Sequence, residues 1–325
     1  MRDAYDQVDR ALVHALQLHA RAPFRLLGQV VGISDQTAAR RYAKLRRAGA
    51  LRVVGVSGLD VLRRSQWIIR VKTAPAAVKA VGAALAARED TSWVNLCGAG
   101  TDIVFAGVGD SAEVLISDTL AHTKAIISIE ADRVLHTFSG GHSSAYTKRG
   151  PLTPEQVAQV LQDVPRRGET GPAERSTPPD AVDQQLLRAF QDDGRATIDA
   201  LAKLVGLSDT STRRRVDALL RTGALRIAVD VDVSLLGVPL RGLLWLRTRT
   251  GTLQAAGDAL ATHTEVTYVA AVTGAAGLLV SIAVEDAAAL YRYLSTRLPD
   301  VPGIDLIETT IVLRHLKAAG SQLGS

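Results

Sequence analysis

The 325-residue sequence is poor in several residue types, and each shortage limits what the chain can be. Cys97 is its one cysteine, so the chain can form no internal disulfide. The sequence opens without the charged stub, apolar core and small-residue cleavage site of a secretory signal. Because disulfides and signals mark exported proteins, both observations lead us to expect a cytoplasmic protein.

Familiar catalytic and metal-binding motifs are also missing. The seven histidines show neither HExxH spacing nor a pairing with cysteine. There is no phosphate-binding loop and no Gly-x-Ser-x-Gly elbow, and the segment Gly107-Val108-Gly109 lacks a third glycine. We therefore predict that the protein is not an enzyme and that it holds no metal and no cofactor.

The longest stretch without a charged residue, 266–284, is long enough to cross a bilayer. Gly274 and Gly277 interrupt it, and Thr267, Thr273 and Ser281 dilute it. Two buried strands joined by a turn explain the stretch better than a membrane span does. We expect no membrane association.

Positive charge is concentrated in two short segments. The whole chain has a formal net charge of +5, whereas residues 34–53 alone carry +5 and residues 208–227 carry +3. The rest of the chain is therefore slightly acidic. This distribution indicates two anion-binding faces rather than a generally basic protein.

The two basic segments belong to an internal repeat. Residues 6–53 align with residues 180–227 without a gap, and 21 of the 48 positions are identical. Weaker similarity follows, in which Ile103-Val104 matches Leu279-Val280 and Val134-Leu135 matches Val312-Leu313. Two copies are too few for a solenoid, so the pattern predicts a duplicated two-part protein.

A stretch rich in proline and glycine, 139–179, separates the copies and is typical of a linker. Within it, Thr153-Pro154-Glu155 precedes Val157, Val160 and Leu161, which predicts a short capped helix that packs back on copy one. We divide the chain into the first and second parts of copy one (1–57 and 58–138), this linker (139–179), the first and second parts of copy two (180–232 and 233–318) and a tail (319–325).

Each copy begins with the pattern of a helix-turn-helix. Two apolar stripes at helical spacing precede Gly32-Ile33-Ser34 in copy one and Gly206-Leu207-Ser208 in copy two. There the glycine can take the positive φ of a tight turn and the serine can cap the next helix. Gly49 and Gly223 are placed to end that helix.

The predicted recognition helices, 34–48 and 208–222, carry arginine on the face opposite their apolar stripe. Such a helix can lie in the major groove, where N-terminal side chains reach base edges and arginines meet phosphates or guanines. A basic helix can equally be a solvated face, but recurrence behind the same turn in both copies favours DNA contact. The candidate DNA-binding residues are Ser34, Gln36, Thr37, Arg40, Arg41, Lys44 and Arg47, with Ser208, Thr210, Ser211, Arg213, Arg214, Arg215 and Arg221.

The remainder of each copy alternates strand and helix patterns in the order βαββαβ. This order predicts a ferredoxin-like unit whose sheet has helices on one face and an open second face. The fold class is therefore α+β, with two helix-turn-helix domains alternating with two ferredoxin-like domains. We expect the open faces to pair, either between the two copies or between chains of a homo-oligomer.

Residues 182–225, with Asp183, Gly194-Arg195, Leu201-Ala202, Gly206-Leu207-Ser208 and Arg214 or Arg215, closely resemble the N-terminal domain of Lrp/AsnC regulators. Residues 8–51 resemble a divergent copy. The resemblance implies a winged helix-turn-helix joined to a ligand-sensing βαββαβ (RAM-type) domain, here in tandem. It also implies a transcription regulator of double-stranded DNA that responds to a small molecule such as an amino acid.

The resemblance also implies effector-binding residues in a glycine-rich loop, where the family commonly has Gly, two variable residues and Asp. Copy one offers Gly98, Gly100, Thr101 and Asp102, which keep the acid but change the spacing. Copy two offers Gly274, Ala275 and Gly277 and lacks the acid. A carboxylate at this place would pair with the ammonium group of a ligand, so copy two is the poorer candidate for a sensor. Both loops can also be ordinary hairpin turns.

Three alternatives stay open. A similar scaffold is used by sirohaem decarboxylases, but this chain reads Ser92-Trp93-Val94-Asn95-Leu96-Cys97 where those enzymes resemble one another in a His-Cys-Tyr-Arg-Pro stretch. The protein can instead be an architectural DNA-binding protein. Finally, one copy can have lost DNA binding; copy one departs more from the family, with Gly28 inside its second helix.

Overall fold

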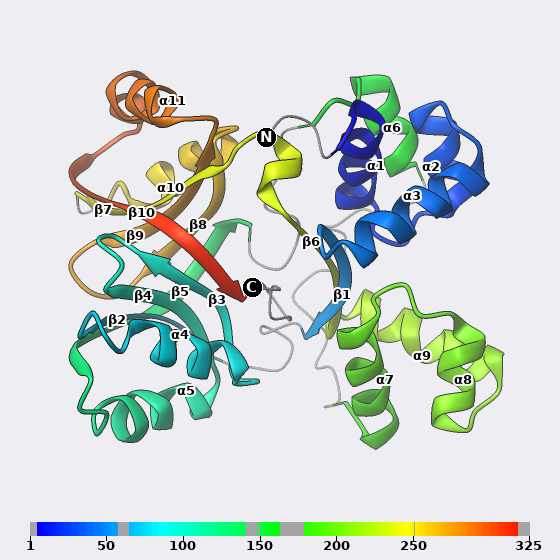
Figure 1. Ribbon diagram of the computed structural model, residues 1–325, viewed down its shortest axis with the longest axis horizontal. Coiled ribbons are helices and arrows are strands. Elements are labelled where there is room, and N and C mark those ends of the chain that lie inside the picture. The colour runs from blue at the N-terminus through cyan, green and yellow to red at the C-terminus, as the bar shows by residue number, and fades with distance from the viewer. Residues whose placement is uncertain are drawn as a thin grey trace. The chain divides into compact units, whose positions relative to one another are not determined.

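The computed structural model describes residues 5–57, 65–140, 148, 150–162, 179–249 and 251–317 (Figure 1). The chain divides into two compact units, Met1–Arg63 with His142–Leu236, and Arg64–Gly141 with Gly237–Ser325. The domains that alternate along the sequence are thus sorted by kind: both helix-turn-helix copies share the first unit, and both sheets share the second. The predicted tail, 319–325, and the central part of the linker, 163–178, lie outside the described residues.

The first unit holds two copies of three helices followed by a strand. Copy one comprises α1 (Gln7–Leu18), α2 (Phe24–Val31), α3 (Asp35–Arg47) and β1 (Leu51–Ser57). Copy two comprises α7 (Ala181–Asp192), α8 (Ile198–Val205), α9 (Asp209–Arg221) and β6 (Leu225–Val231), followed by a 3-10 turn, η2 (Val233–Leu236). The predicted helix-turn-helix is confirmed in both.

The turn chemistry read from the sequence is also confirmed. Gly32 and Gly206 have left-handed φ values of 79° and 69°. The hydroxyls of Ser34 and Ser208 then accept the backbone N–H of the residue three positions on, at 3.1 and 3.3 Å. An exposed N–H group at a helix start needs such an acceptor, so these caps fix where α3 and α9 begin.

The linker helix, α6 (Pro154–Leu161), packs on copy one as predicted. Thr153 caps it, Val160 is fully buried, and the side chain of Gln156 donates to the carbonyl of Val30 at 2.6 Å. Val30 is only 2% exposed under this helix, whereas Leu204, its counterpart in copy two, is 58% exposed. The two copies therefore differ in how their second helix is covered.

The second unit holds the two βαββαβ domains. The first is built from β2 (Gln66–Thr73), α4 (Val78–Ala87), β3 (Thr91–Cys97), β4 (Asp102–Val108), α5 (Asp110–Val114) with the π-helical turn η1 (Leu115–Leu120), and β5 (Ile126–Ser139). The second is built from β7 (Leu240–Thr248), α10 (Leu253–Thr262), β8 (Val266–Val272), β9 (Gly277–Val284), α11 (Ala287–Arg292) with the turns η3 (Tyr293–Arg297) and η4 (Leu298–Asp300), and β10 (Ile304–Lys317).

The eight strands form one closed barrel in the order β10-β3-β4-β2-β5-β8-β9-β7. The last strand of each domain is 14 residues long and pairs with strands of both domains. Its first half pairs with its own domain, and its second half pairs with the other: Val134 lies opposite Val272, and Val312 lies opposite Cys97. The expected pairing of open sheets thus occurs between the two copies of a single chain.

Side-chain alternation separates three apolar cores in this unit. One face of each sheet packs under its own helices, around Ile69 and Phe105 in the first domain and Leu244 and Val280 in the second. The other faces meet inside the barrel and bury residues from both copies, among them Cys97. The uncharged stretch 266–284 forms β8, a turn and β9, and no helix in the described part of the chain is long and apolar enough to span a membrane.

Candidate nucleic-acid interface and sensing hairpins

The inner stripes of α3 and α9 hold these helices against their domains. Ala38 and Leu45 are fully buried in copy one, as is Thr212 in copy two, with Val216 only 3% exposed. Leu220, which follows the buried Leu219, is 36% exposed at the edge of the helix. Because the inner positions are fixed, the residues between them must face solvent.

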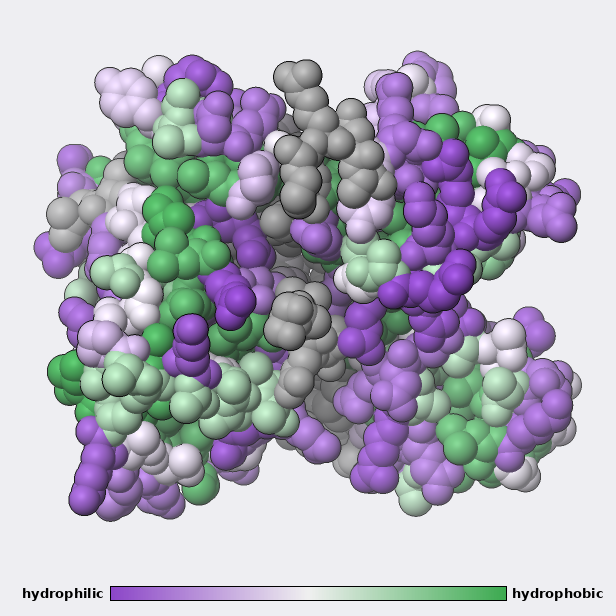
Figure 2. All heavy atoms as spheres, viewed as in Figure 1, coloured by the Kyte–Doolittle hydropathy of each residue, from purple (hydrophilic) through white to green (hydrophobic). Residues whose placement is uncertain are grey.

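Most of the predicted contact residues lie on this solvent face. Figure 2 shows hydrophilic side chains gathered over α3. The exposed candidates are Ser34, Gln36, Arg40, Lys44 and Arg47 on α3, and Ser208, Thr210, Arg213, Arg214 and Arg221 on α9. Thr37 and Ser211 are half-buried, and their hydroxyls bond to the capping serines at 2.8 and 3.1 Å. Their main role is in the cap.

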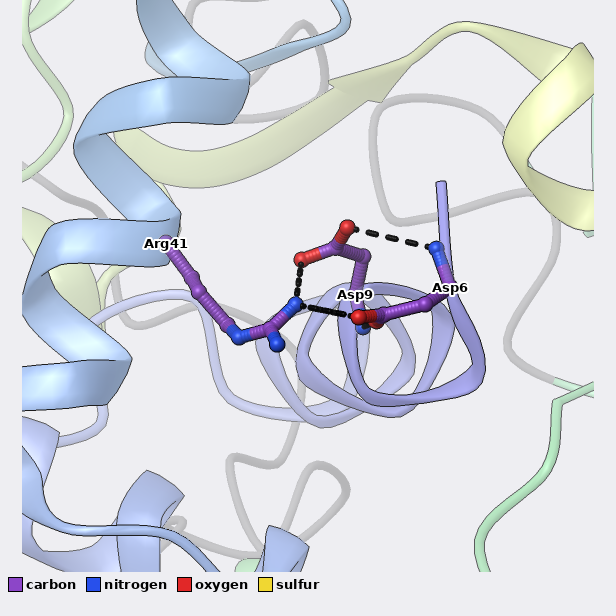
Figure 3. Close-up of polar contacts among 3 residues, drawn as sticks. All are labelled: Asp6, Asp9 and Arg41. Carbon is purple, nitrogen blue, oxygen red and sulfur yellow. Dashed lines mark hydrogen bonds and ion pairs between the residues drawn. The ribbon is translucent and has the colours of Figure 1, made fainter. Parts of the chain in front are cut away.

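Arg41, one of the predicted DNA contacts, is held by two carboxylates. Its Nη1 atom lies 2.8 Å from a carboxylate oxygen of Asp6 and 2.8 Å from one of Asp9 (Figure 3). Asp6 and Asp9 also cap the start of α1 reciprocally, so one arginine joins α3 to that helix end. A charged group held by two carboxylates gains little from a phosphate, and we leave Arg41 out of the proposed DNA contacts.

Copy two repeats this arrangement. Arg215 binds Asp180 at 2.8 Å and Asp183 at 2.9 Å, at the start of α7. A backbone hydrogen bond from Asp183, followed by the bond from Arg215, lowers the pKa of Asp180, and the corresponding bonds from Asp9 and Arg41 lower the pKa of Asp6. Arg215 therefore positions α9, as Arg41 positions α3, and we leave it out of the proposed contacts as well.

Two further arginines tie the copies to each other. Arg21 donates to the carbonyls of Gly194 and Ala196 at 2.7 and 3.1 Å. Arg195 donates to the carbonyls of Ala20 and Ala22, the same positions in copy one, at 2.6 and 2.8 Å. Burial lowers the pKa of both guanidinium groups, which nevertheless keep carbonyl partners. The sequence showed both arginines as identical positions, but not what they touch.

The strands after the helices complete this connection. β1 and β6 pair antiparallel over seven residues, from Leu51 opposite Val231 to Ser57 opposite Leu225. The wing strand of each copy thus pairs with the other copy rather than within its own. Gly194 also donates its N–H to Val53 at 2.8 Å, where a side chain would meet the backbone of β1. The two recognition helices therefore belong to one bonded assembly.

In the second unit, the predicted sensing loop of copy one lies at the β3–β4 hairpin. Gly98 and Gly100 have positive φ values, as the turn requires, and Gly98 donates its N–H to Ile311 of β10 at 2.9 Å. Asp102 is 7% exposed and accepts from Arg70 at 2.9 Å, while Arg70 also binds Glu308 at 2.7 Å. The carboxylate predicted to meet an ammonium is thus already paired through one oxygen. Its other oxygen, Oδ1, is buried without a hydrogen-bond partner among the described residues.

An acidic residue lies beside the copy-two hairpin, although the sequence of that loop contains none. Gly274 and Gly277 have positive φ, and the Thr273 hydroxyl lies 3.4 Å from Asp132, a residue of copy one on β5. A side chain at Gly274 would collide with this carboxylate. Burial raises the pKa of Asp132. The carboxylate absent from the copy-two loop is therefore supplied by the other copy, a contact that no motif within one copy could reveal.

A half-buried polar cluster lies where β3 meets β10. Asn95 donates its amide to the carbonyl of Trp93 at 2.7 Å, which turns its carbonyl oxygen toward His315 Nδ1 at 2.6 Å. This geometry places the proton of neutral His315 on Nδ1. Burial, with a smaller contribution from Arg241, lowers the pKa of His315 to about 3. Trp93 stacks near this ring and has a left-handed φ of 52°, unusual for a bulky side chain.

Cys97 is fully buried on the same strand, and burial raises the pKa of its thiol to about 12. A thiol in that state is a poor nucleophile and a poor metal ligand. Within the described part of the chain, no three histidine, cysteine or acidic side chains come together in a group that could hold a metal ion.

Comparison with known families matches the two parts of the chain separately. Residues 6–46 and 180–220 each match the AsnC-type helix-turn-helix domain, and residues 242–322 match the Lrp/AsnC ligand binding domain. The match to the first domain recurs at both copies, which agrees with the duplication.

Curated relatives are regulators about half as long as this chain. HTH-type transcriptional regulator FL11 of Pyrococcus horikoshii is 24% identical over 141 residues, which cover 43% of this chain and 93% of the relative. Leucine-responsive regulatory protein of Rhizobium meliloti is 28% identical over 144 residues, covering 43% of this chain and 92% of that protein.

A solved structure matches nearly the full length. Siroheme decarboxylase NirDL has a TM-score of 0.60 over 98% of this chain and 95% of its own, at 14% sequence identity. At that identity the match concerns the fold alone: the same tandem architecture exists in a solved protein.

Proposed function

Because the chain belongs to the Lrp/AsnC family of transcription regulators, in a tandem-duplicated form, we propose that it is a sequence-specific regulator that binds double-stranded DNA through α3 and α9. One observation carries the proposal. In both copies the same helix face is exposed and basic. A neighbouring arginine, Arg41 or Arg215, forms ion pairs that hold the helix on its domain. Exposed arginines that recur at the same helical positions in both copies favour an anionic partner over a merely solvated face.

The test is selection of bound fragments from a random duplex library by the full-length protein at moderate salt. A consensus with spaced half-sites supports a sequence-specific regulator. Unselective binding that salt abolishes would replace it with an architectural role, because phosphate contacts alone are strongly salt-dependent. Absence of binding would overturn the proposal.

We further propose a small-molecule effector, such as an amino acid, at the hairpins of the second unit. The proposed contacts are Gly98, Gly100, Thr101 and Asp102 in copy one and Gly274, Ala275 and Gly277 in copy two. Each hairpin has a carboxylate beside it, the buried Asp102 or the half-buried Asp132, which suits a ligand ammonium. Isothermal titration with the twenty amino acids tests this; no heat from any of them at millimolar concentration would count against amino acids as the effector class.

A homo-oligomer is the third part of the proposal. Leu135 and Leu313 occupy matching positions on β5 and β10 and are 62% and 56% exposed. Exposed leucines at both positions suit contact between copies of the chain. We also propose that the protein acts in the cytoplasm, where its DNA partner is.

We propose no catalytic role. The tandem fold is shared with a sirohaem decarboxylase, but Cys97 on β3 is buried, with a raised thiol pKa, and the half-buried His315 on β10 is hydrogen-bonded to Asn95 and has a lowered pKa. Titration of the protein with an iron porphyrin, followed by its visible absorption, provides the test: stoichiometric binding would reopen the enzymatic alternative.

A further inference from the structure

The two recognition helices present different side chains at matching outward positions. Arginine occupies the same place in both copies twice, as Arg40 with Arg214 and Arg47 with Arg221, and all four are exposed. At other positions of the two helices the copies diverge. Four of the differing pairs are Gln36 with Thr210, Ala39 with Arg213, Ala43 with Asp217, and Lys44 with Ala218.

These differences have a direct chemical meaning at base edges. A glutamine amide can bond adenine through its N6 and N7 atoms, whereas an arginine can bond guanine through O6 and N7. Gln36 lies in the first turn of α3, and Arg213 lies one turn further along α9 with the exposed Arg214 beside it. A shallow hollow on α9 is lined by Thr210, Arg213, Arg214, Arg215 and Arg221, together with Asp217 and Ala218. Its arginines favour an anionic or guanine-bearing partner.

The structure also pairs α3 with α9 of the same chain, so that two identical recognition helices are not brought together. The β1–β6 ladder, the reciprocal bonds of Arg21 and Arg195, and the ion pair of Arg46 with Asp193 at 3.2 Å all join copy one to copy two. A homodimer of identical helix-turn-helix domains matches a palindromic site, because protein symmetry is mirrored in the DNA. Here the pair is held within one chain and its members are unequal.

We propose that one chain reads one bipartite DNA site whose two half-sites differ, with an adenine contacted by Gln36 in the α3 half and a guanine contacted by Arg213 in the α9 half. This rests on the proposed function and adds the nature of its operator. The asymmetry of the operator follows from the unequal helices, and the fixed order of its halves follows from their joining in one chain.

The experiment is selection from a duplex library with a random window of about 20 base pairs, which holds two half-sites one helical turn apart. The wild-type chain is compared with Gln36→Thr combined with Ala39→Arg, which gives α3 the residues of α9 at these two positions. Arg188→Ala, on an exposed position of α7, is the matched control. Circular dichroism and thermal melting check that each variant is folded.

We expect the wild type to select unlike half-sites and to bind that site about tenfold or more tightly than a palindrome of either half. The double variant should shift its preference to the palindrome of the α9 half, and Arg188→Ala should behave as wild type. Selection of a palindrome by the wild type, or of a single half-site, would overturn the inference and leave the proposed function standing. If no sequence is selected at all, the proposed function itself fails.

Discussion

Arg21 and Arg195 occupy the same position of the two copies, and each donates to the backbone of the loop in which the other lies. Each guanidinium also lies over an aromatic ring of the opposite copy, Arg21 over Phe190 at 5.2 Å and Arg195 over Phe24 at 4.7 Å. The carbonyl bonds and ring contacts together make this pair a clasp between the helix-turn-helix copies.

Removal of one of these two arginines should lower the stability of the first unit. Arg195→Ala loses charged hydrogen bonds to two carbonyls and should lower the free energy of unfolding by about 2–3 kcal/mol. All three tryptophans of the chain, Trp67, Trp93 and Trp245, belong to the second unit. We therefore expect urea unfolding followed by circular dichroism to shift, while tryptophan fluorescence shifts little. Equal shifts in both signals, or none, would contradict the clasp; Arg188→Ala is the control.

Neighbouring arginines on α3 should behave differently from each other. Arg40→Ala removes an exposed side chain and should weaken DNA binding by about 1–3 kcal/mol, roughly 5- to 150-fold, with a stability change under about 0.5 kcal/mol. Arg214→Ala should do the same in copy two. Unchanged affinity in both variants would refute the assignment of the recognition helices.

Arg41→Ala should instead act through stability. It leaves the buried carboxylate of Asp9 without its cation and should cost about 1–3 kcal/mol of unfolding free energy. Its affinity for DNA, measured where the variant is fully folded, should fall less than that of Arg40→Ala. A larger affinity loss for Arg41→Ala, with stability intact, would return this residue to the DNA contacts.

The stability of the second unit should decrease in mild acid. The pKa of His315 is lowered to about 3 in the folded chain, whereas an unfolded histidine titrates near 6.5. As the pH falls below about 6.5, the histidine is protonated in the unfolded state but stays neutral in the folded state. The free energy of unfolding therefore begins to decrease near pH 6.5 and continues to decrease toward pH 3. Between pH 7 and pH 5 it should reach about 2 kcal/mol.

Urea titrations at pH 7, 6 and 5, followed by tryptophan fluorescence, measure this loss. His315→Gln should be less stable at pH 7 but should show a flatter pH dependence over that range. His122 is exposed, so His122→Gln should leave the wild-type dependence unchanged. A wild-type stability that is constant from pH 7 to pH 5 would show that His315 accepts a proton in the folded chain.

The exposed leucines of β5 and β10 give a test of assembly. Leu135→Glu and Leu313→Glu place a charge on the two matching positions and should reduce the molar mass of the assembly measured by light scattering. Since both side chains are more than half exposed, thermal stability of the chain should change little. A wild-type monomer, or an assembly indifferent to both substitutions, would rule out this interface.

Much of the local structure could be predicted from the sequence. Apolar spacing identified the helices around Leu12 and Leu45, and the Gly-Leu/Ile-Ser turns identified their boundaries, because caps and left-handed glycines act within a few residues. The alternation of apolar residues in the second half of each copy indicated the order βαββαβ along the chain. The repeat indicated two domains of each kind. These features depend on neighbours along the chain.

The contacts that decide how the protein works span 32 to 220 residues and have no local signature. Arg40 and Arg41 look alike in sequence, yet only packing beside α1 gives Arg41 two carboxylates. Asp132 reaches the hairpin at Gly274 only because β5 continues into the other copy's sheet, and His315 meets Asn95 for the same reason on β10. Periodicity determined which face of each element is apolar; the closure of the barrel and the clasp between copies determined which faces, charges and loops meet.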